Sequence, residues 1–535
     1  MTENSLNLLT QPIINATPFG RLTLPGLLAA LARDEVDSFP ALRPHQRPAW
    51  HMFLVQLAAL ALHRAKAVQI PQDEQEWLPI LGGLTTDFPE DEPWRLAVSD
   101  WSKPAFLQPP VPEGVALSTE VPSADALDLL ITSRNHDLKQ TIARYSEPQD
   151  WLFALVSLQT SEGFGGRDNY GIARMNGGSS SRPFLGLAPR DLSAQKTVAV
   201  RPGAHFLRDV RTMLETRAPQ LERYDHLGYP PAGGLGLTWL APWPEGDQLQ
   251  LGQLDIWFIE VCRRIRLTEG PHDLSGARGL SKATRINAKH VNGAVGDAWG
   301  PVDKTGNKSF TLGDNGDFDY RTLSKLLLTG DWERPILARP ASFESDSDEQ
   351  VLIAEALARG NSKTEGFKSR LVPIGGRISR MFSLKEQREK LHAIAQSQAA
   401  DIGHFKKAIS VALALIAARG DSEKLKKEHY AFATEAQSQI DREADNIFFP
   451  HLWARFEAED HGNEAIAQKR QGFAVALYPK ARVIFEAALP SVPCASIFRP
   501  RAEARARRAF RGAIWKHFPE LFTKQEIEET AHAEA

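Results

Sequence analysis

Residues 161–182 read SEGFGGRDNYGIARMNGGSSSR, and this glycine-rich segment sets the first constraint on the fold. It holds six glycines and three arginines but almost no aliphatic residues, so it cannot form a hydrophobic core. Glycine costs backbone entropy, and it is useful where the main chain approaches another group closely or takes a positive φ. That group could be a phosphate, the floor of a groove or a neighbouring strand, and a plain surface loop is an equally open interpretation.

Length and composition describe a globular protein of more than one domain. A chain of 535 residues is too long for one core, and 42% hydrophobic with 24% charged residues is typical of soluble proteins. The net charge of −3 means that any nucleic-acid binding must use local basic patches. Two isolated cysteines, Cys262 and Cys494, exclude a disulfide framework and a cysteine-rich zinc module. We predict no metal and no cofactor.

The start of the chain lacks the basic and apolar regions of a signal peptide. Its most apolar stretches, residues 52–62 and 408–418, reach only about half the length of a membrane span. We therefore predict a cytoplasmic protein that makes no contact with a membrane.

The first part of the chain mixes short helices and strands with irregular segments. Helical spacing predicts helices over residues 24–33, from about Pro48 to Lys66, over 206–215 and over 320–328. Residues 198–200 predict a strand, and 251–266 fit either a strand or a helix. Residues 358–370 predict a short polar hairpin. The basic insert at 131–146 fits either a solvated loop or a phosphate contact.

From about residue 378 the composition changes, because glycine and proline become rare and alanine, glutamate and lysine increase. Residues 383–419, 422–441, 442–460, 464–489 and 501–517 each show helical spacing. We predict an α+β fold in which a large mixed α/β domain with irregular loops, residues 1–377, precedes a C-terminal four-helix bundle, residues 378–535. The last helix is strongly basic, which indicates either a solvated face or an anionic partner.

The sequence contains no recognisable catalytic constellation. No glycine loop closes with the Gly-Lys-Ser/Thr of a phosphate-binding loop, and the nucleophile-elbow and His-Glu-x-x-His motifs are missing. His51 and His63 lie within a predicted helix, where a surface or capping role is favoured over metal binding. Other histidines, including His205, are scattered singly. We therefore predict that the protein is not an enzyme.

Several weak motifs together resemble one family in their order and spacing. They are the Asn-Leu-Leu triplet at residues 7–9, Pro104–Gln108, the Gly-Phe-Gly-Gly sequence at 163–166, Gly236–Trp239 and the helical C-terminal region. This pattern resembles CasA, the large subunit of type I-E CRISPR Cascade complexes.

The resemblance implies a subunit of a ribonucleoprotein that takes part in antiviral defence. Such a subunit reads the protospacer-adjacent motif in double-stranded DNA from the minor groove and helps to start duplex opening and R-loop formation. It also recruits a helicase-nuclease, while guide RNA pairing reads the remaining sequence. The implied partners are the other Cascade subunits, guide RNA, target DNA and that helicase-nuclease.

The resemblance also assigns roles to individual positions. Motif contact falls on the glycine loop, with a lysine finger at one of two positions: Gly163, Phe164, Gly165 and Gly166, with Lys282 or Lys289. The wedge that parts the first base pair falls on Asn361, Ser362 and Lys363, although the family has glutamine where this chain has Ser362.

Further positions follow from the same resemblance. The loop toward guide RNA and backbone subunits falls on Arg134, Asn135, His136 and Lys139. The candidates for contact with DNA phosphates are Arg505, Arg508 and Arg511, with a surface facing a neighbouring subunit as the alternative. Two other functions stay open: a purely structural bridging subunit, and a nucleotide-binding enzyme that uses residues 161–182.

Overall fold

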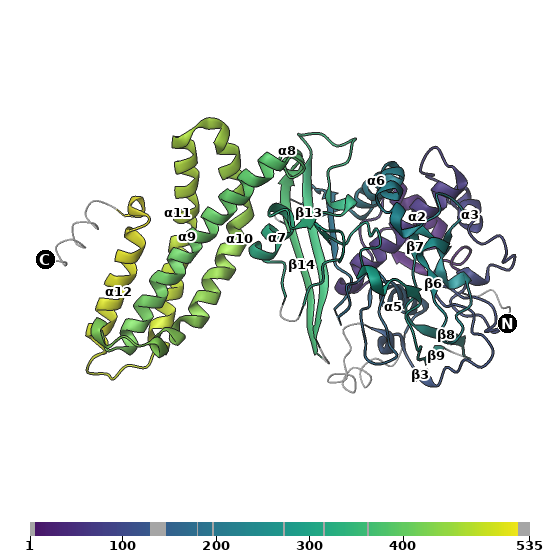
Figure 1. Cartoon of the computed structure of the whole chain (residues 1–535), viewed down its shortest axis with the longest axis horizontal. Coiled ribbons are helices and arrows are strands. Elements are labelled where there is room, and N and C mark those ends of the chain that lie inside the picture. Colours follow the sequence, from purple (N-terminus) through teal and green to yellow (C-terminus); the bar gives the residue numbers. More distant parts are fainter. Residues whose placement is uncertain are drawn as a thin grey trace. The chain divides into compact units, whose positions relative to one another are not determined.

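A computed structural model describes residues 6–128, 146–178, 180–194, 197–270, 273–313, 316–360 and 363–522 of the chain. These residues form two compact units. The first is drawn from residues up to 318 together with 330–380, and the second from 319–329 together with 381 onward. Helices and mostly antiparallel sheets build the first unit, and long helices build the second (Figure 1). The predicted α+β class is confirmed.

Helix α2 (Arg47–Ala65) lies at the centre of the first unit. Pro48 stands in its first turn, where the missing N–H breaks no hydrogen bond. Residues 52–62 are all buried, because a helix that is apolar on every side must be surrounded by protein. Helices α3 (Glu74–Gly82), α5 (Pro148–Ser161) and α6 (Pro202–Arg223) pack against it, and α1 (Leu24–Ala32) packs against α3 and α6.

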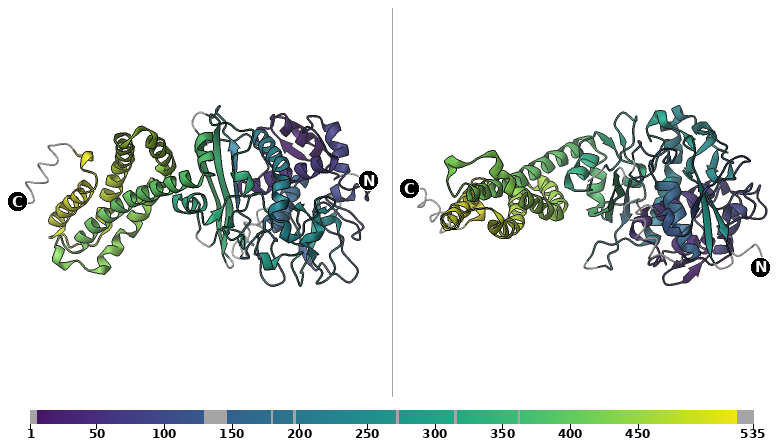
Figure 2. Two further views of the ribbon diagram at one scale, coloured as in Figure 1. Left: turned by 45° about the horizontal axis from the view of Figure 1, so that its top comes forward. Right: turned by 90° about the horizontal axis from the view of Figure 1, so that it is seen from below.

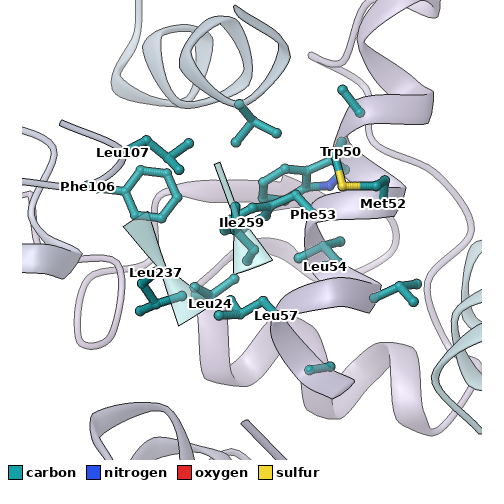
Figure 3. Packing of buried hydrophobic residues seen from close by; sticks show 14 of the residues in the cluster. Leu24, Trp50, Met52, Phe53, Leu54, Leu57, Phe106, Leu107, Leu237 and Ile259 are labelled. Carbon is teal, nitrogen blue, oxygen red and sulfur yellow. The ribbon is translucent and has the colours of Figure 1, made fainter. Parts of the chain in front are cut away.

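The hydrophobic core of this unit gathers around the aromatic residues of α2. Trp50 and Phe53 stack on each other, and Phe106 meets Phe53 edge to face (Figure 3). The one polar side chain within the buried stretch, Gln56, donates hydrogen bonds to the carbonyl oxygens of Trp257 and Phe258. Its amide nitrogen is therefore paired, and it ties α2 to a neighbouring strand.

The strands of the first unit are short and form several small sheets. Strand β4 (Phe184–Pro189) pairs with the hairpin of β13 (Glu349–Gly360) and β14 (Lys363–Gly375). Strands β3 (Thr119–Val121), β9 (Leu274–Gly279) and β8 (Arg264–Glu269) form a second antiparallel sheet, and β5 (Leu235–Leu237) runs parallel to β7 (Leu254–Ile259). The described strands before the hairpin are β1 (Ile14–Ala16), β2 (Gly20–Leu22), β3 (Thr119–Val121), β4 (Phe184–Pro189), β5 (Leu235–Leu237), β6 (Leu249–Gln250), β7 (Leu254–Ile259), β8 (Arg264–Glu269), β9 (Leu274–Gly279), β10 (Ile286–Asn287), β11 (Val302–Asp303) and β12 (Trp332–Glu333).

The hairpin of β13 (Glu349–Gly360) and β14 (Lys363–Gly375) is much longer than the short polar hairpin that the sequence predicts (Figures 1 and 2). Its register runs from Glu349 opposite Gly375 to Gly360 opposite Lys363. The predicted strand at residues 198–200 is wrong. Val198 and Val200 instead pack their side chains beside this sheet without joining a ladder.

The second unit contains α7 (Tyr320–Leu328), α9 (Lys385–Ala417), α10 (Thr434–Ala458), α11 (Asn463–Ala488) and α12 (Arg499–Trp515). The predicted helix break at residue 441 is wrong, because α10 continues through it. Asp441 accepts hydrogen bonds from Arg321 and Lys406, so its side chain does not compete with the helix backbone. None of the described helices combines the length and apolarity needed to cross a bilayer.

Candidate nucleic-acid interface

The glycine-rich segment leaves the end of α5 and folds back on itself. Glu162 forms an isolated bridge with Ser181, and the N–H of Phe164 donates to the carbonyl oxygen of Gly178 at 2.7 Å. A tight turn follows, in which Gly165 donates to Asn169 at 2.8 Å and Asn169 donates to Gly166 at 3.0 Å. The segment is therefore an ordered loop with its own hydrogen bonds.

Glycine is required at different positions of this loop for different physical reasons. A Cβ on Gly163 would lie 2.3 Å from the carbonyl oxygen of Ser180, and one on Gly171 would lie 2.5 Å from the backbone of Gly163. These two glycines allow close packing within the loop. Gly166 instead has φ of +114°, with open space where a Cβ would be.

Exposure divides the predicted motif contacts into two groups. Gly163 is buried, so its role lies inside the loop. Phe164 and Gly165 are exposed and Gly166 is half-buried. The next residue, Arg167, has 95% of its side chain exposed. The part of the loop that can reach a partner is therefore the turn of residues 164–167, which we call the exposed turn.

One buried arginine, Arg263, holds the base of the loop. Its guanidinium donates to the carbonyl oxygens of Gly163 (3.0 Å) and Tyr170, and it forms an ion pair with Glu162 at 2.9 Å. Burial acts to lower the pKa of Arg263, but attraction to Glu162 and Cys262 and the hydrogen bonds to both together outweigh it, so the pKa is raised. Arg263 therefore stays charged and fixes both ends of the exposed turn.

Of the two candidate lysines, Lys282 belongs to a segment that contacts Asp168, the residue directly after the exposed turn. The N–H of its neighbour Ser281 donates to the carbonyl oxygen of Asp168 at 3.1 Å. The Lys282 side chain is 78% exposed and lies 3.8 Å from Glu245. Lys289 is also exposed, but its segment packs through Gly293 against Met175 and Asn176, on the other arm of the loop.

The β13–β14 hairpin reaches the same region. Arg359, near the end of β13, pairs with Glu162 at 3.1 Å, and its carbonyl oxygen accepts a hydrogen bond from Ser180. Asn361 and Ser362 lie outside the described residues. Lys363 is the first residue of β14, opposite Gly360. The structure thus brings the end of this hairpin to the base of the glycine-rich loop.

Comparisons with known proteins identify the fold. No protein-family model and no curated protein matches the sequence. Among solved structures, the CRISPR-associated protein Cse1 from Acidimicrobium ferrooxidans matches with a TM-score of 0.61 at 13% identity, covering 97% of this chain and 100% of that one. Cse1 from Thermobifida fusca matches with a TM-score of 0.61 at 14% identity, covering 97% and 98%.

A third solved structure, CasA from Thermus thermophilus, matches with a TM-score of 0.57 at 16% identity, covering 96% of this chain and 100% of that one. The chain has the CasA fold. This fold likeness covers 96–97% of the chain, so it extends over both units.

The remaining predicted contacts of the CasA fold lie in two other places. Arg134, Asn135, His136 and Lys139 fall outside the described residues. Arg505, Arg508 and Arg511 are exposed on α12. Arg505 donates to the carbonyl oxygen of Gly420 at 2.6 Å, so it also secures the segment that follows α9. Arg508 and Arg511 have no ion-pair partner among the described residues.

Sequence reasoning missed two features of this CasA fold. The role of Arg263 depends on partners 93 to 101 positions earlier in the chain, such as Tyr170 and Glu162. No local sequence pattern predicts contacts over that separation. His51 and His205 are not isolated either, because their rings stack with centroids 3.7 Å apart. The only local signal was the i, i+4 spacing of His205 and Asp209 on a helix.

Proposed function

We propose that this chain is the large subunit of a type I-E CRISPR Cascade complex and reads the protospacer-adjacent motif of double-stranded DNA from the minor groove. Its support is the CasA fold over nearly the whole chain, together with the adjacency of the exposed turn and Lys282. On this proposal the chain is not an enzyme. The chemistry belongs to a helicase-nuclease that it recruits, and the sequence beyond the motif is read by guide RNA pairing.

The exposed turn suits a narrow groove. The B-DNA minor groove is only about 6 Å wide and distinguishes mainly A·T from G·C. Gly165 and Gly166 present backbone without side chains, so the main chain can approach base edges, while Lys282 reaches from the adjacent segment. The exposed turn is therefore narrow enough to enter the groove, and Lys282 provides a charged hydrogen-bond donor.

The hairpin end suits the next step, which is separation of the first base pair. Unstacking one base step costs a few kcal/mol, so the wedge must be held firmly. Arg359 and Ser180 tie β13 to the loop that would hold the motif. On this proposal Asn361, Ser362 and Lys363 meet the duplex directly beside the motif and start the R-loop. Arg134, Asn135, His136 and Lys139 contact guide RNA and the other subunits.

A binding comparison on duplexes with a randomised flanking motif tests this function. The assembled complex is measured at one fixed salt concentration, with and without this chain. We expect motif preference only when the chain is present. If the preference is the same without it, the chain is a structural bridge. Motif-independent binding of a nucleotide by the isolated chain, with turnover, would favour the enzyme alternative.

A further inference from the structure

A second cluster of polar side chains lies in the first unit, apart from the contacts proposed for DNA. His51 of α2 and His205 and Asp209 of α6 meet there. The Nε2 atoms of His51 and His205 lie 2.9 and 3.1 Å from the same Oδ2 atom of Asp209. One potential ligand atom from each of the three residues lies within 4.8 Å of the other two.

The two nitrogen–oxygen separations are close to the spacing of ligand atoms around a zinc ion. Two ligands at about 2.0–2.1 Å from a tetrahedral zinc ion stand about 3.3 Å apart. The two rings are nearly parallel, with 18° between their planes. Binding of an ion between the three atoms therefore requires the rings to rotate about their Cβ–Cγ bonds, so that the Nε2 lone pairs point at the ion instead of at Asp209.

The cluster opens onto a cavity of about 430 Å³. His51 and His205 line it, together with Glu355 and apolar side chains such as Trp50, Phe184 and Trp299. Glu355 accepts a hydrogen bond from Ser369 at 2.8 Å. Three protein ligands beside an open space are the pattern of a metal site that keeps one position for water or a ligand.

A second layer of charged groups fixes the carboxylate. Arg208 donates to the other oxygen of Asp209, Oδ1, at 2.9 Å, and it also donates to Glu344 at 2.8 Å. Hydrogen bonds of this kind orient ligating carboxylates in metal proteins. The Oδ2 atom therefore stays directed at the two histidines.

We propose that His51, His205 and Asp209 bind one divalent transition-metal ion, with zinc as the best fit, and leave its fourth position open to the cavity. Two imidazoles and one carboxylate suit zinc better than magnesium or calcium, which prefer oxygen ligands. The ion joins α2 to α6 and stabilises the first unit. This proposal does not depend on the DNA-binding function.

The test is zinc binding by the full chain purified without a polyhistidine tag. The protein is stripped with a chelator and titrated with Zn²⁺, and bound metal and melting temperature are measured. Co²⁺ serves as a spectroscopic substitute, since its visible absorption reports four-coordination. The variants are His51→Gln and His205→Gln, which keep an amide donor toward Asp209. The matched control is His226→Gln, because His226 is exposed on a short turn.

We expect the wild type and His226→Gln to bind one zinc that raises the melting temperature, because a ligand that binds only the folded state stabilises it. Both cluster variants should fold, by circular dichroism, but lose this zinc and the intense Co²⁺ bands. Equal zinc binding in wild type and cluster variants would overturn the proposal. A wild type whose melting temperature does not respond to zinc would also overturn it. The two histidines would then serve only as hydrogen-bond partners of the buried Asp209 carboxylate.

Discussion

Ser281 donates its backbone N–H to the carbonyl oxygen of Asp168 at 3.1 Å, although the two residues are 113 positions apart. This bond places Lys282 beside the exposed turn of the glycine-rich loop. Because it joins backbone to backbone, the placement does not depend on the flexible side chain of Lys282. The contact selects Lys282 over Lys289 as the proposed finger.

Removing the anchor of the loop should free it without unfolding the unit. Arg263→Met deletes the donors to Gly163 and Tyr170 and the ion pair with Glu162. Breaking a buried ion pair lowers the free energy of unfolding by about 3–5 kcal/mol. Here the loss is smaller, because Glu162 still forms an ion pair with Arg359. We expect lower stability and faster amide exchange confined to residues 163–171, measured by mass spectrometry. Unchanged exchange in that segment would contradict the anchoring role.

The loop glycines should differ sharply from a helical glycine. Gly163→Ala forces a Cβ against two carbonyl oxygens and should destabilise by about 1–3 kcal/mol. The matched control is Gly472→Ala in α11, where a Cβ meets open space and alanine should stabilise by about 0.5–1 kcal/mol. Denaturant unfolding followed separately for each unit checks this. A neutral Gly163→Ala would mean that the loop is not closely packed.

The metal-free protein should lose stability as the pH falls from about 6.5 to about 4. The pKa of His51 is about 4 in the folded chain, against 6.5 for an ordinary histidine, so the unfolded state binds more protons in this range. The carboxyl of Asp209, whose pKa is also lowered, adds a loss in the same direction at still lower pH. His51→Gln should flatten the dependence by at most about 3 kcal/mol, because each pKa unit corresponds to about 1.4 kcal/mol. Melting temperatures across this pH range measure it, and an identical profile in His51→Gln would refute the assignment.

The arginines of α12 should separate into two classes. Arg508→Ala and Arg511→Ala should each weaken DNA binding by the complex and lower the slope of log affinity against log salt by about 1, as expected for one phosphate contact. Arg505→Ala should instead lower the stability of the second unit, since it removes the hydrogen bond to Gly420. If no variant changes the salt slope, this face of α12 meets a protein subunit or solvent rather than DNA.

Local patterns in the sequence predicted the elements well and their partners poorly. The helical spacing after Pro48 identified α2, and residues 320–328 identified α7, because amphipathic or apolar periodicity is a local property. The length of the β13–β14 hairpin was missed because short apolar runs, such as residues 351–358, do not distinguish a strand from a buried helix. No single motif was specific to CasA. The resemblance was recognised because several weak motifs follow one another in the family's order along most of the chain.

The site was predictable only as a set of segments. Gly163–Gly166, with Lys282 or Lys289, were identified as candidates, but whether each is exposed depends on long-range hydrogen bonds. Gly163 turned out to be buried because Ser180 and Gly178 close over it. The pairing of His51 with His205 could not be foreseen, since it arises from the packing of α2 against α6.

The most direct test of the proposed motif reader is Lys282→Ala in the assembled complex. The measured quantity is the ratio of affinities for the preferred and a scrambled motif at one salt concentration. The control is Lys304→Ala, since Lys304 is similarly exposed and 3.6 Å from Asp331. Lys282 makes only a weak surface ion pair, so its loss should not affect folding.

We predict that Lys282→Ala lowers the affinity ratio about tenfold, which corresponds to about 1.4 kcal/mol, while assembly and the Lys304→Ala ratio stay unchanged. An unchanged ratio in Lys282→Ala, with a normal complex, would contradict the account of the exposed turn and Lys282 as the reader of the motif.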